Sequence, residues 1–136
     1  MTEKNSPKTS CNTPRKACHR LTPCDDCPWR TDVPPGKFPV TRFQKLAVTA
    51  YDMSTTQFAC HKSPEGQEYA CAGFLLSGSA HNLGVRIGIM KKLIRLSQVH
   101  SDYPLFRNYR EMAIANGVNP SDPVLRPCRL DTAIKP

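Results

Sequence analysis

The sequence predicts a mainly helical protein with a small irregular or β-hairpin part, an α+β fold in which about three helices pack on a cysteine-ligated metal site. Four cysteines stand at spacings that suit a metal site, and three segments carry apolar residues at helical intervals. Only 39% of the 136 residues are apolar and 13 are prolines, so we expect a small core and long irregular stretches. A fold with a small core often needs an additional cross-link for stability, and a bound metal ion can provide one.

The first half of the predicted site is a tight turn that begins at Cys24. Cys24 and Cys27 have the two-residue spacing that directs two thiolates at one metal ion. Asp25-Asp26 fills the turn, and Trp29 follows with a large apolar ring that could shield the sulfurs from water. One such turn supplies two ligands, so the other two must come from elsewhere in the chain.

Cys60 and Cys71 are the best candidates for the second half. The segment Ser63–Gly66 between them is a strong turn signal, because proline and glycine occupy turn-favoured places. Folding back at this turn would pair 57–60 with 68–71 and place Cys60 opposite Cys71. The complete pattern is C-x2-C, 32 intervening residues, then C-x10-C.

Three helices are predicted from apolar residues at helical spacing. Period alone does not decide whether the short apolar run 72–76 is a strand or a helix. The predicted helices are about Arg42–Tyr51, with Thr41 and Gln44 at capping-box spacing; about Leu83–Val99, with Asn82 as N-cap; and about Pro104–Asn116, capped by Ser101 or Asp102.

Arg86 breaks the pattern of the second helix. It projects into an apolar stripe, where a cation is costly unless it meets an anion or several acceptors. Four thiolates on a divalent metal leave a negative site, so Arg86 is a candidate counter-charge, and Arg30 is a second one. The alternative is that Arg86 reaches the surface or bonds carbonyl groups. The stripe consists of Leu83, Ile87, Met90, Leu93 and Ile94.

Charge and composition divide the chain into three parts. Residues 1–20 form a predicted disordered basic tail, 21–117 a single metal-stapled domain, and 118–136 a proline-rich irregular segment. The net charge is +8, which favours nucleic acid or an acidic host protein as a partner, although a solvated basic surface explains it equally. The residues that would contact phosphates or an acidic partner are Lys91, Lys92, Arg95, Arg15, Lys16 and Arg20.

The remaining cysteines and the N-terminus bear on the compartment. Cys11, Cys18 and Cys128 have no supporting neighbours, so we expect free thiols. Seven cysteines is an odd number, and the N-terminus lacks the apolar region of a signal peptide. The sequence also has no long apolar run that could span a membrane. We therefore expect a cytoplasmic protein with reduced cysteines.

Three short motifs resemble a family of small phage and bacterial proteins of unknown function. The resemblance extends over about residues 24–86. It implies that the four cysteines belong to one constellation and that the protein is a small accessory protein. The resemblance leaves open a phage origin, in which case the protein would work in the cytoplasm of a bacterial host. The motifs are C-x-x-C-P-W-R from Cys24, F-A-C-H-K from Phe58, and C-A-G-F from Cys71.

Two metal centres suit four cysteines. A Zn²⁺ ion in a closed tetrahedral site would be structural, and we prefer it. A [4Fe–4S] cluster also takes four cysteines, and Cys27-Pro28 is similar to the Cys-Pro of bacterial ferredoxin motifs. His61 is an alternative ligand to Cys60. Because adjacent residues rarely both reach one metal, Cys60 is the better choice.

These observations favour a small non-enzymatic metal-binding accessory or regulatory protein that binds nucleic acid or a host protein through basic surfaces. An iron–sulfur redox or iron-sensing regulator is the alternative. A small enzyme that uses cysteine and histidine is the third reading, but Cys60 and His61 would diverge on a strand, and no other pairing has a supporting spacing. We find no phosphate-binding glycine loop and no paired-carboxylate motif.

Overall fold

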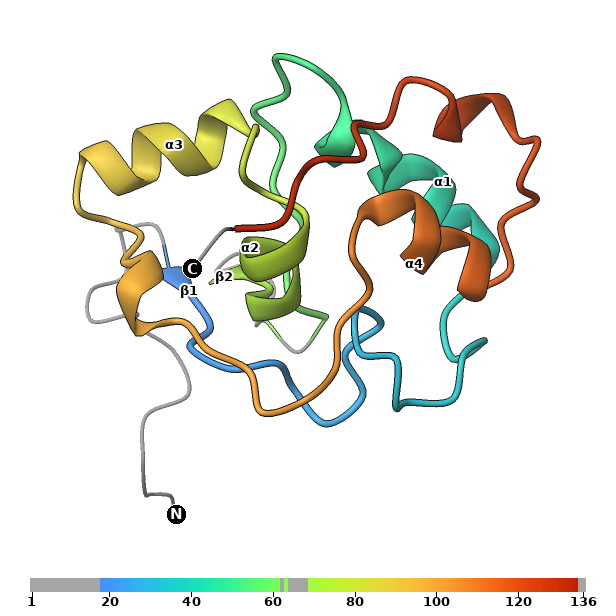
Figure 1. Ribbon diagram of the computed structural model, residues 1–136, viewed down its shortest axis with the longest axis horizontal. Coiled ribbons are helices and arrows are strands. Elements are labelled where there is room, and N and C mark those ends of the chain that lie inside the picture. The colour runs from blue at the N-terminus through green and yellow to red at the C-terminus, as the bar shows by residue number, and fades with distance from the viewer. Residues whose placement is uncertain (1–17, 62, 64–68, 135–136) are drawn as a thin grey trace.

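The computed structural model describes residues 18–61, 63 and 69–134 (Figure 1). Within this part of the chain the secondary structure is short and mostly helical, as the sequence predicted. Figure 1 shows α2 near the centre, with α3 on one side and α1 and α4 on the other. The elements are β1 (Cys18–His19), α1 (Val40–Leu46), η1 (Ala47–Ala50), β2 (Tyr69–Ala70), α2 (Ala72–Ser77), α3 (Leu83–Met90), η2 (Leu96–Gln98), α4 (Tyr109–Ala115) and η3 (Pro123–Leu125).

The core is built around the indole ring of Trp29, which is fully buried. The rings of Phe58 and Tyr109 each lie 6.0 Å from it in edge-to-face geometry, and Phe74 lies at 6.4 Å. Such aromatic pairs add stabilisation beyond the area that they bury. Because Trp29 follows directly on the cysteine turn, the core and the candidate site are parts of one packed unit.

Three chain segments lie side by side next to α2. β1 pairs with β2 in parallel, and Ala70 in β2 also forms an antiparallel bridge with Ala59. Residues 18–20 had been assigned to the disordered tail. They belong instead to this small sheet: His19 is fully buried, and the Arg20 N–H donates to the Ala70 carbonyl at 2.9 Å. A strand of two residues is too short to show a hydrophobic period, so it could not be predicted from the sequence.

The first helix begins earlier than predicted, at Val40. Pro39 is its N-cap and no side chain caps it, so the capping box predicted from Thr41 and Gln44 is wrong. Proline brings a fixed φ and needs no partner for an N–H, which suits a helix start. The predicted apolar face is buried, but from Ala47 the helix tightens into the 3₁₀ turn η1.

The second helix starts as predicted, because the Asn82 side chain accepts a hydrogen bond from the Val85 N–H at 3.1 Å. It ends at Met90, not at Val99. Lys92 adopts φ +62°, and the N–H groups of Lys92 and Leu93 donate to the carbonyls of Ile89 and Gly88. This is a Schellman end, in which glycine usually takes the left-handed position that Lys92 holds here.

The buried face of α3 also differs from the predicted one. Val85 and Gly88 face the core, and a β-carbon on Gly88 would lie 2.7 Å from the Ile94 side chain. The returning chain therefore packs Ile94 against Gly88. Ile87 and Met90, which the sequence placed on the buried stripe, are 47% and 80% exposed.

The last α-helix begins at Tyr109, five residues later than Pro104, and Asn108 caps it by accepting the Glu111 N–H at 2.9 Å. The predicted caps Ser101 and Asp102 are therefore wrong. The residues before the helix are extended, because Leu105 forms an antiparallel bridge with Arg30. This pairing attaches the segment to the cysteine turn.

Residues 118–134 run over α1 and α2 after the last α-helix. Their proline-rich sequence gives one short turn, η3, in which Leu125 is buried. Backbone hydrogen bonds fix the path: the Arg129 N–H donates to Ala50 at 2.8 Å, and the Ile134 N–H donates to Leu76 at 2.8 Å.

Candidate metal centre

The first half of the site is a tight turn from Cys24 to Cys27. The Cys27 N–H donates to the Cys24 carbonyl at 3.3 Å, and the Arg30 N–H donates to the Cys27 carbonyl at 3.1 Å. Backbone N–H groups of Asp26 and Trp29 donate to the sulfurs of Cys24 and Cys27 and favour their thiolate forms. The turn therefore aims both sulfurs and the donors that stabilise them toward one side.

Arg30 holds this turn from outside. Its guanidinium donates to the carbonyls of Cys24 at 3.2 Å and Asp25 at 3.3 Å, pairs with Asp32 at 2.8 Å, and stacks 3.5 Å above the Tyr103 ring. The Asp32 carboxylate raises the pKa of Arg30, and Arg30 lowers the pKa of Asp32. The Arg30 guanidinium thus lies beside the cysteine turn, where it contacts backbone carbonyls and Asp32. That Arg30 balances the charge of a metal centre stays a prediction.

The second half comes from antiparallel pairing of 58–60 with 69–71. The Cys60 N–H donates to the Tyr69 carbonyl at 2.8 Å, and the Cys71 N–H donates to the Phe58 carbonyl at 2.9 Å. In this register Cys60 lies across from Tyr69, so the prediction that Cys60 and Cys71 are directly opposite is wrong by two residues. Because side chains alternate along a strand, the two cysteines still share one face of the pairing.

The four cysteines lie together in the interior. None of the four is in a disulfide, and each residue is at most 4% exposed. The Cys24 thiol contacts those of Cys27 and Cys60, and the sulfurs of Cys27 and Cys71 are 3.5 Å apart. The four thiols therefore form a continuous chain of contacts, Cys60 to Cys24 to Cys27 to Cys71.

Burial and contact with neighbouring thiols make Cys24 and Cys27 hard to ionise. The hydrogen bond with Cys27 and burial raise the pKa of Cys24 to about 11. For Cys27 the hydrogen bond from Cys24 lowers the pKa, but Cys71 and burial together outweigh it and raise the pKa overall. Buried thiolates are costly without a cation, whereas a metal ion displaces the protons and neutralises the thiolates.

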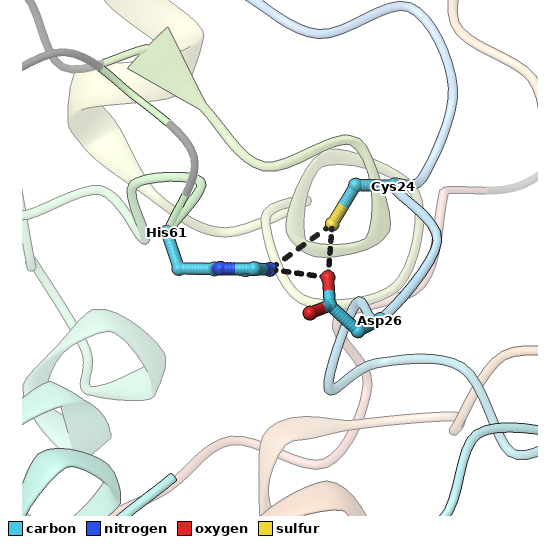
Figure 2. A group of neighbouring side chains, drawn as sticks. All are labelled: Cys24, Asp26 and His61. Carbon is cyan, nitrogen blue, oxygen red and sulfur yellow. Dashed lines mark hydrogen bonds and ion pairs between the residues drawn. The ribbon is translucent and has the colours of Figure 1, made fainter. Parts of the chain in front are cut away.

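Asp26 and His61 complete the cluster on its more open side (Figure 2). The His61 Nε2 atom lies 2.8 Å from the Asp26 Oδ1 atom and 3.3 Å from the Cys24 sulfur, and the sulfur is 3.6 Å from Oδ1. All three ligand atoms thus lie within 4.8 Å of one another, as in a group that could hold a metal ion. The Lys37 ammonium contacts the other Asp26 oxygen at 3.3 Å.

This arrangement differs from a catalytic Cys–His–Asp relay. In a relay the nucleophile and the acid contact different ring nitrogens of the histidine, so that a proton can pass across the ring. Here Cys24 and Asp26 both contact Nε2. Convergence of three atoms on one point is instead the geometry of shared ligation.

Cys60 and His61 both contact Cys24 although they are adjacent in sequence, and the choice of Cys60 over His61 as a ligand stays a prediction. Both contacts are possible because of a turn directly after Cys60, where the N–H and hydroxyl groups of Ser63 donate to the Cys60 carbonyl at 3.0 and 2.6 Å. The turn redirects His61 toward Asp26. Asp26 is not among the ligands predicted from the sequence, although its carboxylate stands between two predicted cysteine ligands.

Trp29 and Gly73 close the site from the core side. A β-carbon on Gly73 would lie 2.5 Å from the Trp29 Cβ atom and 3.1 Å from the Cys27 sulfur. The residue two positions after Cys71 must therefore lack a side chain for α2 to approach the cysteine turn. The Trp29 side chain is fully buried, and its Nε1 group has no hydrogen-bond partner among the described residues.

The other predicted site residues lie elsewhere. Arg86 is exposed and donates to the Ala80 carbonyl at 3.4 Å, which is the carbonyl-bonding alternative rather than a contact with a sulfur. Arg20 is 7% exposed and donates to the Thr22 carbonyl at 3.0 Å, so it presents little charge to a partner. Lys91, Lys92 and Arg95 are exposed after α3, and Arg15, Lys16 and Cys11 lie outside the described residues.

Cys128 is separate from the cluster. It is 8% exposed and its thiol contacts the carbonyls of Ala47 and Val124 at 3.8 and 3.7 Å. Burial raises the pKa of this thiol to about 11, so it is a buried thiol of low reactivity.

Comparison with known proteins assigns the chain to a family. Neither the curated proteins nor the solved structures gave a match. Each helix in the described part of the chain is too short or too polar to cross a bilayer. One family matches residues 19–129, a wider range than the 24–86 expected from the motifs, and it includes the segment after α4. The chain therefore belongs to the family of unknown function designated DUF6283.

Proposed function

We propose that this protein binds a single metal ion, preferably Zn²⁺, through Cys24, Cys27, Cys60 and Cys71. The observation that carries the proposal is the 3.5 Å separation of the Cys27 and Cys71 sulfurs within a buried group of cysteines that form no disulfide. Zinc–sulfur bonds of about 2.3 Å at tetrahedral angles place two sulfurs about 3.8 Å apart. A small adjustment of the thiols would therefore accommodate the ion.

A [4Fe–4S] cluster fits this separation less well. In a four-iron cluster each cysteine binds a different iron, so the inorganic core lies between the sulfurs and keeps them well apart. Cys27 and Cys71 would have to separate, and Gly73 and Trp29 leave little room for such a movement. These contacts favour a single ion over a cluster.

Asp26 and His61 would form the outer part of this centre. His61 contacts Cys24, so it is the alternative ligand if one cysteine remains outside the coordination sphere. Otherwise the His61 ring and the Asp26 carboxylate orient Cys24 and control its access to water. Groups that orient metal ligands commonly change metal affinity about 10–100-fold when they are removed.

The role of the ion would be structural and not catalytic. Four protein ligands close a zinc site, whereas catalytic zinc keeps a position for water or substrate. The centre connects the cysteine turn, the 58–60 segment and the start of α2, which are distant in sequence and lack long regular elements to hold them. Its reduced thiols fit a reducing compartment such as the cytoplasm. We therefore propose an accessory protein without enzymatic activity.

Elemental analysis of freshly purified protein, combined with X-ray absorption at the zinc edge, tests the proposal. We expect one zinc ion per chain and a first shell of four sulfurs. Cys71→Ser should abolish stoichiometric binding, whereas Cys128→Ser should retain it. Brown protein with iron and acid-labile sulfide, or wild-type protein that binds no metal when refolded with Zn²⁺, would refute a structural zinc ion.

A further inference from the structure

The outward face of α3 is unusually apolar for a surface helix. Val85 and Gly88 face the core, yet Ile87, Ile89 and Met90 on the opposite side are 47%, 37% and 80% exposed. At 100° per residue, Ile89, Arg86, Met90, Leu83 and Ile87 follow one another around this outward face. A helix that is apolar on all sides is normally covered on all sides.

A cavity of about 470 Å³ adjoins this face, between α3 and the segment 131–134. Its apolar lining includes Val85, Ile89, Leu96 and Ile134, and Arg86 stands in its wall. The volume lies in the range of protein sites that receive a ligand or an anchoring side chain. The exposed residues of α3 continue beyond the cavity, so a covering molecule would have to be longer than the cavity itself.

The charge around this surface is positive. Arg86 makes no ion pair among the described residues; its hydrogen bond goes to the Ala80 carbonyl. Lys91, Lys92 and Arg95 are exposed directly after the helix. The carboxylate in the cavity wall, Asp131, is already paired with Arg129 at 2.9 Å. The surface thus offers an apolar groove with unpaired cations, which calls for an occupant with apolar and acidic groups.

We propose that this face docks an acidic amphipathic helix of a partner protein. Leucine-like side chains at helical spacing would fill the cavity and cover Met90 and Ile87, while flanking carboxylates would meet Arg86 and the lysines. Helix-in-groove recognition uses such anchors, and methionine adapts to them because its side chain is flexible and polarisable. The inference is independent of the metal centre.

Charge argues against two other occupants. A symmetric second copy of this chain would bring Arg86 and the cations after α3 against the same groups of its partner, and like charges at an interface cost several kcal/mol. Residues 1–17 contain Lys4, Lys8, Arg15 and Lys16 against a single acidic residue, Glu3, so they have the wrong sign as well.

A displayed peptide library provides the test. The peptides would have about 15 residues, enough to form a helix, with leucine fixed at i, i+3, i+4 and i+7 and the other positions chosen among Glu, Lys, Gln and Ser. After selection against metal-replete protein, enriched peptides are measured by fluorescence anisotropy. Arg86→Gln and Met90→Ser test the groove. Arg126→Gln and Met53→Ser are matched controls, since both residues are exposed and Met53 is 76% exposed.

We expect enrichment of Glu, affinity that falls with added salt, and a Kd weakened about tenfold or more in each groove variant but unchanged in the controls. Enrichment of Lys, or of no peptide, would overturn the proposal. So would equal loss in groove and control variants. The face would belong to a second copy of this chain if the wild type forms a dimer and Met90→Ser abolishes it. It would belong to a nucleic acid or a membrane if no peptide binds, but duplex DNA or anionic vesicles do, and Arg86→Gln abolishes that binding.

Discussion

Gly73 stands directly against Trp29, so closely that a β-carbon on Gly73 would lie 2.5 Å from the Cβ atom of the tryptophan. This contact joins the helix that follows Cys71 to the turn that contains Cys27. Because α2 and the turn cannot separate without moving one cysteine away from the other, the packing of the core and the geometry of the metal centre depend on the same pair.

Gly73→Ala should therefore loosen the site and the core together. The added methyl group meets the backbone-proximal Cβ atom of a buried ring, which cannot rotate away, and overpacking of this kind costs about 1–3 kcal/mol. We expect that loss in the free energy of unfolding in urea, together with weaker zinc binding in a chelator competition.

Gly36→Ala is the control for Gly73→Ala. Gly36 has φ +89°, and a β-carbon there meets nothing within 4 Å, so alanine adds backbone strain of about 1–2 kcal/mol without crowding. It should lower stability and leave zinc affinity unchanged. If Gly73→Ala keeps wild-type zinc affinity as well, the contact with Trp29 does not position the sulfurs.

Replacement of a cluster cysteine should cost far more than replacement of Cys128. Cys24→Ser or Cys71→Ser would remove the stability linked to metal binding, about 4 kcal/mol when free zinc exceeds its Kd a thousandfold. Thermal unfolding with and without a chelator measures this term. Cys128→Ser should remain within about 1 kcal/mol of wild type, since a hydroxyl can also donate to the Ala47 carbonyl. If Cys128→Ser loses as much stability as the cluster variants, the stability of the protein does not depend on metal binding by the cluster.

Local patterns in the sequence identified the parts of the site but not their arrangement. The C-x2-C turn and the N-cap Asn82 depend on neighbours in sequence, and the structure has both. The convergence of Asp26 with His61 depends on the turn after Cys60, which no periodicity signals. The end of α3 was missed because Lys92, not a glycine, takes the left-handed position.

The apolar face of α3 was assigned to the wrong side for a related reason. The stripe from Leu83 to Met90 has the right spacing to be buried, but Gly88 allows Ile94 to pack closely on the other side. Glycine has no side chain to add to a hydrophobic pattern, so a helix face that contains glycine is not predicted to be buried. Its small size nevertheless decides here which side of α3 packs against the core.

His61→Gln distinguishes a metal ligand from a residue that orients one. If four cysteines bind zinc, the variant should keep one zinc per chain and lose about 10–100-fold in affinity, because only the support of Cys24 is removed. Asp26→Asn should show a smaller loss, since the amide still reaches His61. Complete loss of stoichiometric zinc in His61→Gln would make His61 a ligand in place of one cysteine. The number of sulfurs seen by X-ray absorption would then be three.

His19 should make stability fall at mildly acidic pH. The ring is fully buried, its Nδ1–H donates to the Arg20 carbonyl at 3.0 Å, and its Nε2 atom accepts the Arg95 N–H at 3.2 Å, so the folded state holds the neutral form. Burial lowers the pKa of His19, and the Arg95 charge lowers it further, although the Arg20 carbonyl opposes them. Below about pH 6.5 the unfolded chain therefore binds more protons than the folded one, and the stability present above that pH is lost as the pH falls toward the folded pKa.

Urea unfolding at pH 5.5 and 7.5 measures this loss. Acid also protonates the metal ligands, so the informative quantity is the difference between wild type and His19→Gln, which cancels the contribution of the cluster. Glutamine can donate to Arg20 and accept from Arg95 without titrating, so the variant should lose less stability between the two pH values than wild type does. Equal losses in wild type and His19→Gln would place the acid sensitivity in other groups, such as the cysteine cluster or His81, whose pKa burial also lowers.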